Sequence, residues 1–209
     1  MIKNKFIVVE GIEGSGKTEA CKIIYDYLYK YGITNTIIVR EPGGTIISEK
    51  IRKLIISNYN DESLNKETEL LLIYAARVQL VKKIIQPALK KGLIVIGDRH
   101  HLSSLAYQGG GLGINKKKIS SLKKMFIKTL NPHLTIYLDV DPKVGLSRVN
   151  QRGIKDRIEN KSIKFFTKVR NTYLKLIKNC PTIITVNTMQ KKNLVRNNLE
   201  LIIKKWINL

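Results

Sequence analysis

Short apolar runs of four or five residues alternate along this chain with longer segments in which apolar residues return every three or four positions. The short runs are rich in Ile and Val and predict buried strands, whereas the longer spacing predicts amphipathic helices. The predicted strands are residues 6–10, 36–39, 93–96, 134–138 and 182–186. The predicted helices are one that starts at Lys17, followed by 46–56, 64–89, 116–129, 142–149, 162–177 and 191–207. Apolar strands that alternate with helices form parallel sheets covered on both faces, so the pattern predicts an α/β fold: a five-stranded parallel sheet flanked by helices.

Charged residues follow the predicted strands at the point where each strand ends. They are Glu10, Arg40, Glu41, Asp98, Arg99 and Asp139. In an open parallel sheet the ligand site lies beyond the carboxyl ends of the strands, so we expect chemistry at this edge. A second glycine-dense stretch, AYQGGGLG at 106–113, is expected to be a loop.

The first predicted strand leads directly into the glycine-rich stretch EGIEGSGKT. Its spacing is that of a phosphate-binding loop, in which backbone N–H groups and a helix N-terminus hold the phosphates of a nucleotide. Lys17 would reach the β and γ phosphates, and the Thr18 hydroxyl would ligate magnesium. The other interpretation is a chance glycine-rich turn. The predicted strand before the stretch and the predicted helix after it argue against a chance turn, because a phosphate-binding loop requires both. The expected ATP-binding residues are Gly11, Ile12, Glu13, Gly14, Ser15, Gly16, Lys17 and Thr18.

Two further groups could complete a phosphoryl-transfer site. Asp98 ends an apolar run and is a candidate to hold magnesium or to orient the acceptor, although it could instead cap the next helix. Arg148, Arg152 and Arg157 lie close together around a glycine, where a basic lid of about 148–159 could close over the reaction. The simpler interpretation is that these are ordinary exposed arginines.

Composition limits the class of protein. The 209 residues suffice for a single domain, 1–209, and no apolar run approaches the roughly 20 residues of a membrane-spanning helix. The N-terminus has no signal-peptide pattern and the two cysteines have no metal or disulfide spacing, so we expect a cytoplasmic protein with both cysteines buried. The net charge of +22 reflects 29 lysines and only nine arginines against 16 acidic residues, and the lysine runs lack aromatic residues. Dedicated nucleic-acid binding is therefore not expected, because Arg and aromatic side chains are the usual means of that recognition.

Eight segments in order carry a resemblance to a known family. They are EGIEGSGKT (10–18), REPGGT (40–45), EKIRKLI (49–55), YAARVQ (74–79), GDRH (97–100), AYQGGG (106–111), YLDVDP (137–142) and RGIKDRIE (152–159). Over essentially its full length, the chain resembles thymidylate kinase of the bacterial type. The resemblance implies a homodimer with a P-loop nucleoside monophosphate kinase fold, which transfers the γ-phosphoryl group of ATP to dTMP with magnesium.

The resemblance also implies roles for single residues. Arg77 and Gln108 would bind the thymine edge, and Arg52 and Arg99 would hold the 5′-phosphate of dTMP. Tyr107 would lie beneath the sugar, Glu13 would accept a hydrogen bond from the 3′-hydroxyl, and Arg40 and Glu41 would line the same cleft. Lys17, Asp98, Arg148 and Arg152 would be the catalytic residues, with Thr18 and Asp98 at the metal. The alternative, purely structural interpretations are that Tyr107 is a core aromatic residue and that Arg52 pairs with Glu49 along one helix face.

Three positions depart from the family pattern. Ile73 stands where a phenylalanine usually stacks on thymine, which predicts weaker dTMP binding because isoleucine lacks the ring. Asn150 replaces a frequent lid arginine, and Asn187 replaces a frequent aspartate near the adenine-side loop.

Other functions remain open from the sequence. Within enzymes, the alternatives are another nucleoside monophosphate kinase or a deoxynucleoside kinase of similar fold. A nucleic-acid-binding ATPase would use the positive charge, and a GTPase switch is disfavoured because Asn115 is followed by three lysines and not by a guanine-binding motif.

Overall fold

The computed structural model describes residues 4–59, 62–153, 155–178 and 180–207. Its sheet contains β1 (Phe6–Gly11), β2 (Thr36–Arg40), β3 (Ile94–Asp98), β4 (Leu134–Asp139) and β5 (Ile183–Asn187). The strands are all parallel and lie in the order β2-β3-β1-β4-β5, so β1 is central and β2 and β5 form the edges. The predicted α/β class and all five strands are confirmed.

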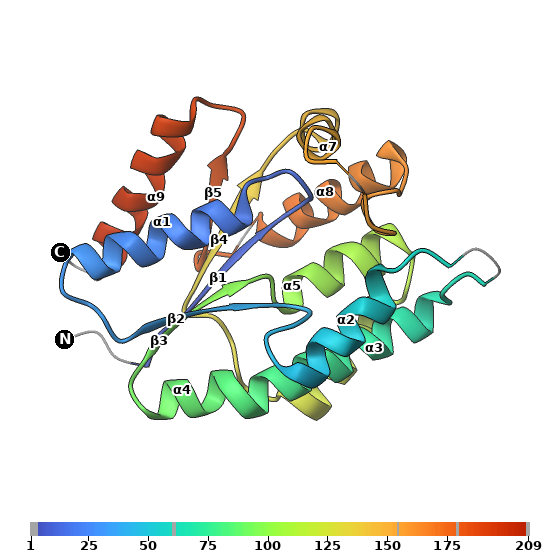
Figure 1. The fold of residues 1–209 in the computed structure, drawn as a ribbon, viewed down its shortest axis with the longest axis horizontal. Coiled ribbons are helices and arrows are strands. Elements are labelled where there is room, and N and C mark those ends of the chain that lie inside the picture. Colours follow the sequence, from blue (N-terminus) through green and yellow to red (C-terminus); the bar gives the residue numbers. More distant parts are fainter. Residues whose placement is uncertain (1–3, 60–61, 154, 179, 208–209) are drawn as a thin grey trace.

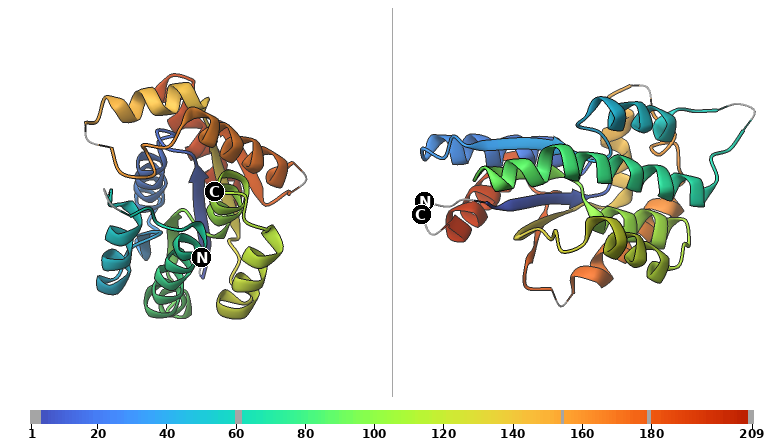
Figure 2. Two further views of the ribbon diagram at one scale, coloured as in Figure 1. Left: turned by 90° about the vertical axis from the view of Figure 1, so that its right-hand side faces the viewer. Right: turned by 90° about the horizontal axis from the view of Figure 1, so that it is seen from below.

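Helices cover both faces of the sheet (Figures 1 and 2). They are α1 (Lys17–Lys30), α2 (Ile46–Ile56), α3 (Lys66–Leu80), α4 (Gln86–Lys90), α5 (His101–Ser104), α6 (Lys116–Leu122), α7 (Pro142–Asn150), α8 (Ile163–Ile177) and α9 (Lys192–Ile207). The helices α3, α5 and α6 are each extended by a π-helical segment, namely η1 (Val81–Ile85), η2 (Leu105–Gly111) and η3 (Lys123–Ile127). Along the parts of the chain that the structure describes, no helix is both long enough and apolar enough to cross a membrane.

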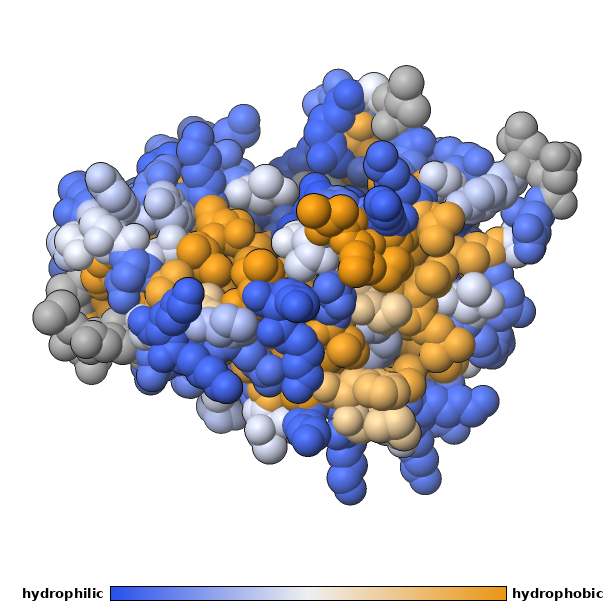
Figure 3. Space-filling model, turned by 60° about the horizontal axis from the view of Figure 1, so that its bottom comes forward, coloured by the Kyte–Doolittle hydropathy of each residue, from blue (hydrophilic) through white to orange (hydrophobic). Residues whose placement is uncertain are grey.

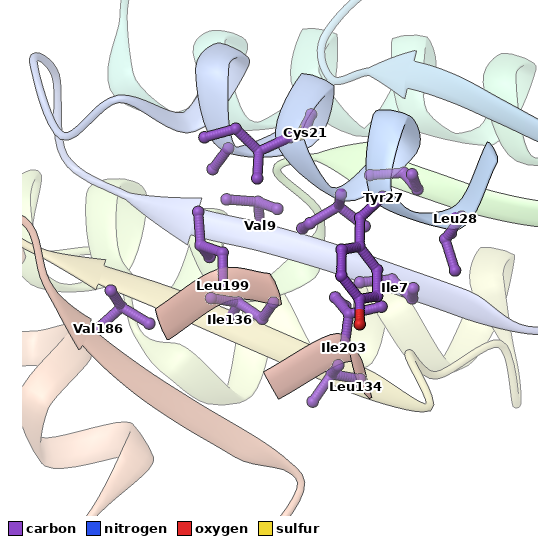
Figure 4. Close-up of a cluster of buried hydrophobic side chains, with 14 of the residues drawn as sticks. Ile7, Val9, Cys21, Tyr27, Leu28, Leu134, Ile136, Val186, Leu199 and Ile203 are labelled. Carbon is purple, nitrogen blue, oxygen red and sulfur yellow. The ribbon is translucent and has the colours of Figure 1, made fainter. Parts of the chain in front are cut away.

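Alternate side chains of the central strand β1 pack into two different hydrophobic layers, one on each face of the sheet. Ile7 and Val9 pack beneath α1 and α9, among the side chains drawn in Figure 4. Phe6 and Val8 point the other way, into the layer formed by α3, η1 and α6. This alternation is what a strand buried on both faces requires, since successive side chains point to opposite sides. It fixes β1 firmly, and with it the glycine loop at its carboxyl end.

The predicted helix 64–89 is confirmed as the continuous helical stretch of α3, η1 and α4, and the predicted helix 116–129 is confirmed as α6 and η3, which end at Ile127. Two other expectations about local structure are corrected. The stretch 106–113, expected to be a loop, is mostly the π-helical segment η2. Its glycines serve close packing: a Cβ on Gly110 would lie 2.0 Å from the Thr172 hydroxyl of α8, and one on Gly111 would lie 2.4 Å from Phe165. Cys21 is buried as expected, but Cys180 is only partly buried.

Candidate active site

A cavity of about 630 Å³ opens at the carboxyl ends of the central strands, where the sequence predicted the chemistry. Most of the predicted site residues line it together: Glu13, Gly14, Gly16, Lys17, Thr18, Arg52, Ile73, Arg77, Asp98, Arg99, Tyr107, Gln108, Arg148 and Arg152. Gly11, Ile12 and Ser15 lie behind this lining and are buried. Residues that lie as far apart in the sequence as Glu13 and Arg152 therefore meet in one cleft.

The glycine loop follows β1 and ends where α1 begins, at Lys17. Gly14 and Gly16 have φ angles of +71° and +87°, in the left-handed region that favours glycine. A Cβ on Gly14 would lie 2.1 Å from the carbonyl oxygen of Gly145 in α7, so the loop rests directly on the backbone of that helix. Around Gly16 a Cβ would meet no atom within 4 Å. The loop is thus supported from behind and open toward the cleft, the shape that an anion-binding cradle needs.

Lys17 points along the loop and donates to the carbonyl oxygen of Ile12 at 2.8 Å. Burial, followed by repulsion from Arg99, lowers the pKa of Lys17 from 10.5 to about 8, although nearby carboxylates oppose the shift. In the part of the chain that the structure describes, the ammonium group contacts the Ile12 carbonyl and the Ser15 hydroxyl and forms no ion pair with a carboxylate. Such a group gains most when a phosphate enters the cradle.

The Thr18 hydroxyl donates to the Asp98 carboxylate at 3.1 Å, which joins the start of α1 to the end of β3. Both are hard oxygen ligands that face one cleft, as magnesium prefers. In residues 4–59, 62–153, 155–178 and 180–207, no cluster of three His, Cys, Asp or Glu side chains could hold a metal alone. These oxygens suit an ion that keeps waters and substrate phosphates as its other ligands.

Glu13 turns out of the phosphate cradle toward the opposite wall of the cleft. Its carboxylate accepts from Arg99 at 2.8 Å and from the Tyr107 hydroxyl at 2.5 Å. Arg99 also donates to the carbonyl oxygen of Gly11 at 2.8 Å, and its guanidinium lies 4.8 Å from the Tyr107 ring centroid. The negative charge of Glu13 therefore sits beside a guanidinium and not among the N–H groups of the loop.

Arg77 is fully enclosed at the base of the cleft and is held on several sides. It donates through Nε to Glu41 at 2.6 Å, through Nη1 to Ser104 at 2.9 Å and through Nη2 to the carbonyl of His100 at 3.1 Å. The ring of Tyr74 lies against the guanidinium, 4.8 Å away. Each Nη atom carries two hydrogens, so one N–H on each remains for a ligand.

Glu41 receives a second buried partner besides Arg77. Burial alone would raise the pKa of Glu41, but His100 and then Arg77 outweigh that effect and lower the pKa to about 2. The carboxylate can then only accept, so Nδ1 of His100 donates to it at 2.8 Å. The sequence placed Glu41 in the cleft but gave no sign that it orients Arg77.

Gln108 and the lid segment meet at Glu69, which sequence reasoning missed. Gln108 donates from its amide nitrogen to one carboxylate oxygen of Glu69 at 2.8 Å, and Arg157 donates to the other at 2.5 Å. Glu69 precedes Ile73 by four positions and Arg77 by eight on α3, so helical spacing alone could have placed it on the cleft face.

The remaining arginines of the predicted site line the cleft as expected but differ in their contacts. Arg52 does not pair with Glu49; it donates to the carbonyl of Pro42 at 3.0 Å, while Glu49 pairs with Arg40 at 3.0 Å. Arg148 lies within α7 and contacts the carbonyls of Gly14 (3.2 Å) and Thr188 (2.9 Å).

The segment after α7 carries the other two arginines of the predicted lid. Arg152 is 65% exposed and pairs with Glu159 at 3.0 Å. Arg157 is turned inward onto Glu69 and the carbonyl of Ile55. Position 154 of the predicted lid lies outside the described residues.

Two strand-end carboxylates do not reach the cleft. Asp139 forms a two-point ion pair with Arg170 at 2.8 and 2.9 Å. Glu10 is wholly buried, where it accepts from the hydroxyls of Ser103 and Tyr173. A position at the end of a strand therefore identifies carboxylates that could belong to the site. Whether such a carboxylate can bind a ligand depends on whether neighbouring hydrogen-bond donors already occupy it.

Comparisons with known proteins match the whole chain. The family model described as thymidylate kinase matches residues 9–199. The thymidylate kinase of Buchnera aphidicola subsp. Schizaphis graminum is 56% identical over 207 residues, 99% of this chain and 98% of that protein. The thymidylate kinase of Vibrio parahaemolyticus is 44% identical over 208 residues, 100% of this chain and 99% of that protein. The crystal structure of thymidylate kinase from Ehrlichia chaffeensis superposes with a TM-score of 0.77 at 31% identity, covering 99% of this chain and 100% of that one.

Proposed function

Because this chain belongs to the thymidylate kinase family, we propose a division of its cleft between the two substrates of that reaction, ATP and dTMP. The reaction transfers the γ-phosphoryl group of ATP to the phosphate of dTMP and gives dTDP and ADP. The observation that carries the division is that one cavity is lined both by the glycine loop with Lys17 and by the buried pair Arg77 and Gln108. Since ATP and dTMP are cytoplasmic metabolites, we place the enzyme in the cytoplasm.

The glycine loop forms the donor side. The N–H groups at the start of α1 bind the phosphates of ATP, and Lys17 exchanges its bond to the Ile12 carbonyl for the β and γ phosphate oxygens. Thr18 and Asp98 hold magnesium, which neutralises phosphate charge when bound.

Residues from α2, α3 and η2 form the acceptor side. Arg77 directs its two remaining N–H groups at a base carbonyl, Gln108 binds the neighbouring base edge, and the Ile73 side chain covers a base face. Arg52 and Arg99 hold the 5′-phosphate. Tyr107 and Glu13, joined by their short hydrogen bond, lie where the sugar must pass between base and phosphate.

Transfer is in line and needs no covalent enzyme intermediate. The acceptor phosphate oxygen is already anionic at neutral pH, so no strong general base is required. Charge that develops on the moving phosphoryl group is stabilised by Lys17, by Arg148 beside the loop and by Arg152 from the lid. The segment 148–159 acts as that lid, closing from the edge where Arg152 is exposed.

A steady-state ATP assay with competing acceptors tests the function. We expect dTMP to be preferred over dCMP and dGMP, because Arg77 and Gln108 suit a pyrimidine with a 4-oxo group. Thymidine should be inert, because it lacks the phosphate that Arg52 and Arg99 would hold. Preference for a purine nucleotide or for thymidine would contradict the assignment in favour of another nucleoside monophosphate kinase or a deoxynucleoside kinase.

Replacing Glu13 with alanine should raise the KM for dTMP about tenfold or more and leave the KM for ATP nearly unchanged. The reason is that Glu13 faces Arg99 and Tyr107 on the acceptor wall and not the phosphate cradle. Substrate-variation kinetics with each nucleotide in turn would measure both constants. An equal rise in both would show that Glu13 supports the loop as a whole.

The pH dependence of ATP use should follow Lys17. Its pKa of about 8 means that the free enzyme loses this charge as the pH rises through 8, where an exposed lysine would still be protonated. We therefore expect kcat/KM for ATP to fall about tenfold per pH unit above that value, since kcat/KM reports free-enzyme ionisations. Lys17→Arg keeps its charge across this range and should flatten the profile. A flat profile between pH 7 and 10 in the unaltered enzyme would refute the assignment.

We also propose that the enzyme is a homodimer, joined through an apolar face over α3 and η3. Leu71, Met125 and Phe126 there are 58%, 63% and 43% exposed. α3 is fastened to the neighbouring α6 by a hydrogen bond from the Tyr74 hydroxyl to the Ile119 carbonyl. Figure 3 shows several exposed apolar patches on one face of the molecule, with hydrophilic residues between them. Large exposed apolar side chains that gather on one face are typical of an association site.

Light scattering tests the dimer. The unaltered protein should have twice the chain mass of 23.9 kDa, and Leu71→Arg should shift it toward the monomer. Leu201→Arg is the matched control, because Leu201 is 49% exposed on α9, away from this face. A monomeric unaltered protein, or loss of the dimer with Leu201→Arg alone, would contradict the proposed interface.

A further inference from the structure

Glu69 is a carboxylate 2% exposed in the wall of the active-site cleft, and the division of substrates above gives it no role. We propose that Glu69 is a positioning residue, which sets the orientation of the Gln108 amide and joins that orientation to the lid segment through Arg157. The proposal rests on the proposed function, in which Gln108 binds the acceptor base.

The contact between Glu69 and Gln108 fixes which end of the amide faces the substrate. An amide can donate from its nitrogen or accept at its oxygen, but an ionised carboxylate can only accept. The 2.8 Å bond to Glu69 therefore holds the amide nitrogen of Gln108 against the protein. Among the described residues, the Gln108 Oε1 accepts no hydrogen bond from the protein, and it is not one of the buried atoms that lack a partner, since the only such atom is Nε2 of His100. The Gln108 Oε1 is therefore accessible, and because Gln108 lines the cavity, this oxygen faces the cleft.

The orientation of this amide determines which pyrimidine fits. A carbonyl oxygen in the cleft accepts a hydrogen bond, and N3 of thymine carries a hydrogen to donate. N3 of cytosine carries only a lone pair and would face the carbonyl oxygen of Gln108 without a shared hydrogen. Arg77 adds to this selection, because its free N–H groups suit the 4-oxo group of thymine and not the 4-amino group of cytosine. Glu69 thus converts an ambiguous side chain into one that favours a 4-oxo pyrimidine.

The second carboxylate oxygen of Glu69 connects this selection to the lid. It accepts from Arg157, whose Nε also donates to the carbonyl of Ile55 at 2.7 Å. The backbone N–H of Arg157 donates to the carbonyl of Ile56 at 2.9 Å, so the segment is anchored at the end of α2. Arg157 also compensates the buried charge of Glu69, which would otherwise be costly. A single carboxylate therefore contacts the base-binding amide on one side and the lid segment on the other.

Glu69→Gln tests the proposal, because glutamine keeps the size of the side chain but can offer either an oxygen or an NH₂ group to Gln108. The Gln108 amide is then free to turn over. We expect the preference for dTMP over dCMP, as a ratio of kcat/KM values, to fall at least about tenfold, mostly through a higher KM for dTMP. Glu67→Gln is the matched control: Glu67 lies on the same helix, is exposed, and should leave the ratio unchanged.

A double-mutant cycle tests the connection to Arg157. Arg157→Ala should lower the same ratio by a smaller factor, since it removes one of the groups that orient the carboxylate. With both substitutions the loss should be no larger than with Glu69→Gln alone, because both act through one side chain. Additive losses would overturn the coupling.

An unchanged ratio in Glu69→Gln, with only a lower melting temperature, would overturn the positioning role and leave Glu69 a structural residue. That failure is distinct from failure of the proposed function. In the latter case the unaltered enzyme itself would show no preference for dTMP.

Discussion

Replacing Lys17 with methionine is expected to lower kcat/KM for ATP about a hundred- to a thousandfold, the range seen when a charge-stabilising donor is removed from other enzymes. Methionine keeps much of the length and volume of lysine but has no charge. The ammonium group already lies inside the loop, 2.8 Å from the Ile12 carbonyl, so it needs only a change of partner to reach a phosphate. Initial-rate kinetics with ATP varied at saturating dTMP would measure the loss.

Lys22→Met provides the matched control for this result. Lys22 lies five positions later on α1 and is exposed, so its loss removes the same charge from the surface of the same helix. Activity near that of the unaltered enzyme is expected. If both variants lost activity to the same degree, the effect would belong to the helix or to the overall charge and not to the loop.

Replacing Arg152 with alanine should lower kcat about a hundredfold and change the KM values little. Arg152 is 65% exposed, and among the described residues its side chain pairs with Glu159 alone, at the rim of the cleft. We therefore expect it to move toward the phosphates when the proposed lid closes. Arg148 has less freedom, because it is fixed between two backbone carbonyls, one in the glycine loop and one at Thr188. We therefore propose Arg152 as the residue that follows the charge in the transition state.

Single-turnover rates of Arg152→Ala would measure the chemical step apart from product release. Arg196→Ala removes an arginine of comparable exposure from α9 and should leave the rate unchanged. Near-normal turnover of Arg152→Ala would show that Arg152 has no catalytic role, and stabilisation of the transferred phosphoryl group would then be assigned to Arg148 and Lys17.

The strands and the glycine loop could be predicted from the sequence because each is determined by residues that are adjacent along the chain. Each strand is a short apolar run, and the glycine loop is a continuous stretch whose strand and helix are adjacent to it. The segment 106–113 was predicted wrongly because glycines signal a turn when read locally, while here they allow η2 to approach α8. That contact joins residues about sixty positions apart, and nothing in either segment alone predicts it.

The same limit applied to the site. The residues proposed to bind the substrates belong to recognisable motifs, but the groups that orient them are set by tertiary contacts. Glu69 meets Gln108 across 39 positions, and Glu41 meets His100 across 59. The alternative in which Arg52 pairs with Glu49 does not hold, because Glu49 is occupied by Arg40 and by the backbone N–H of Gly44.

The contact between Gly14 and Gly145 restricts how this enzyme can be altered by exchange of parts. A Cβ on Gly145 would lie 2.5 Å from the carbonyl oxygen of Glu13, so α7 and the glycine loop are fitted to each other through bare backbone. The helix that leads into the arginine-rich segment therefore cannot be transplanted as an independent module. A chimera that took this helix from another kinase would keep its nucleotide site only if the new helix had a glycine at the position of Gly145. We therefore expect the sequences of α7 and of the glycine loop to change together in evolution.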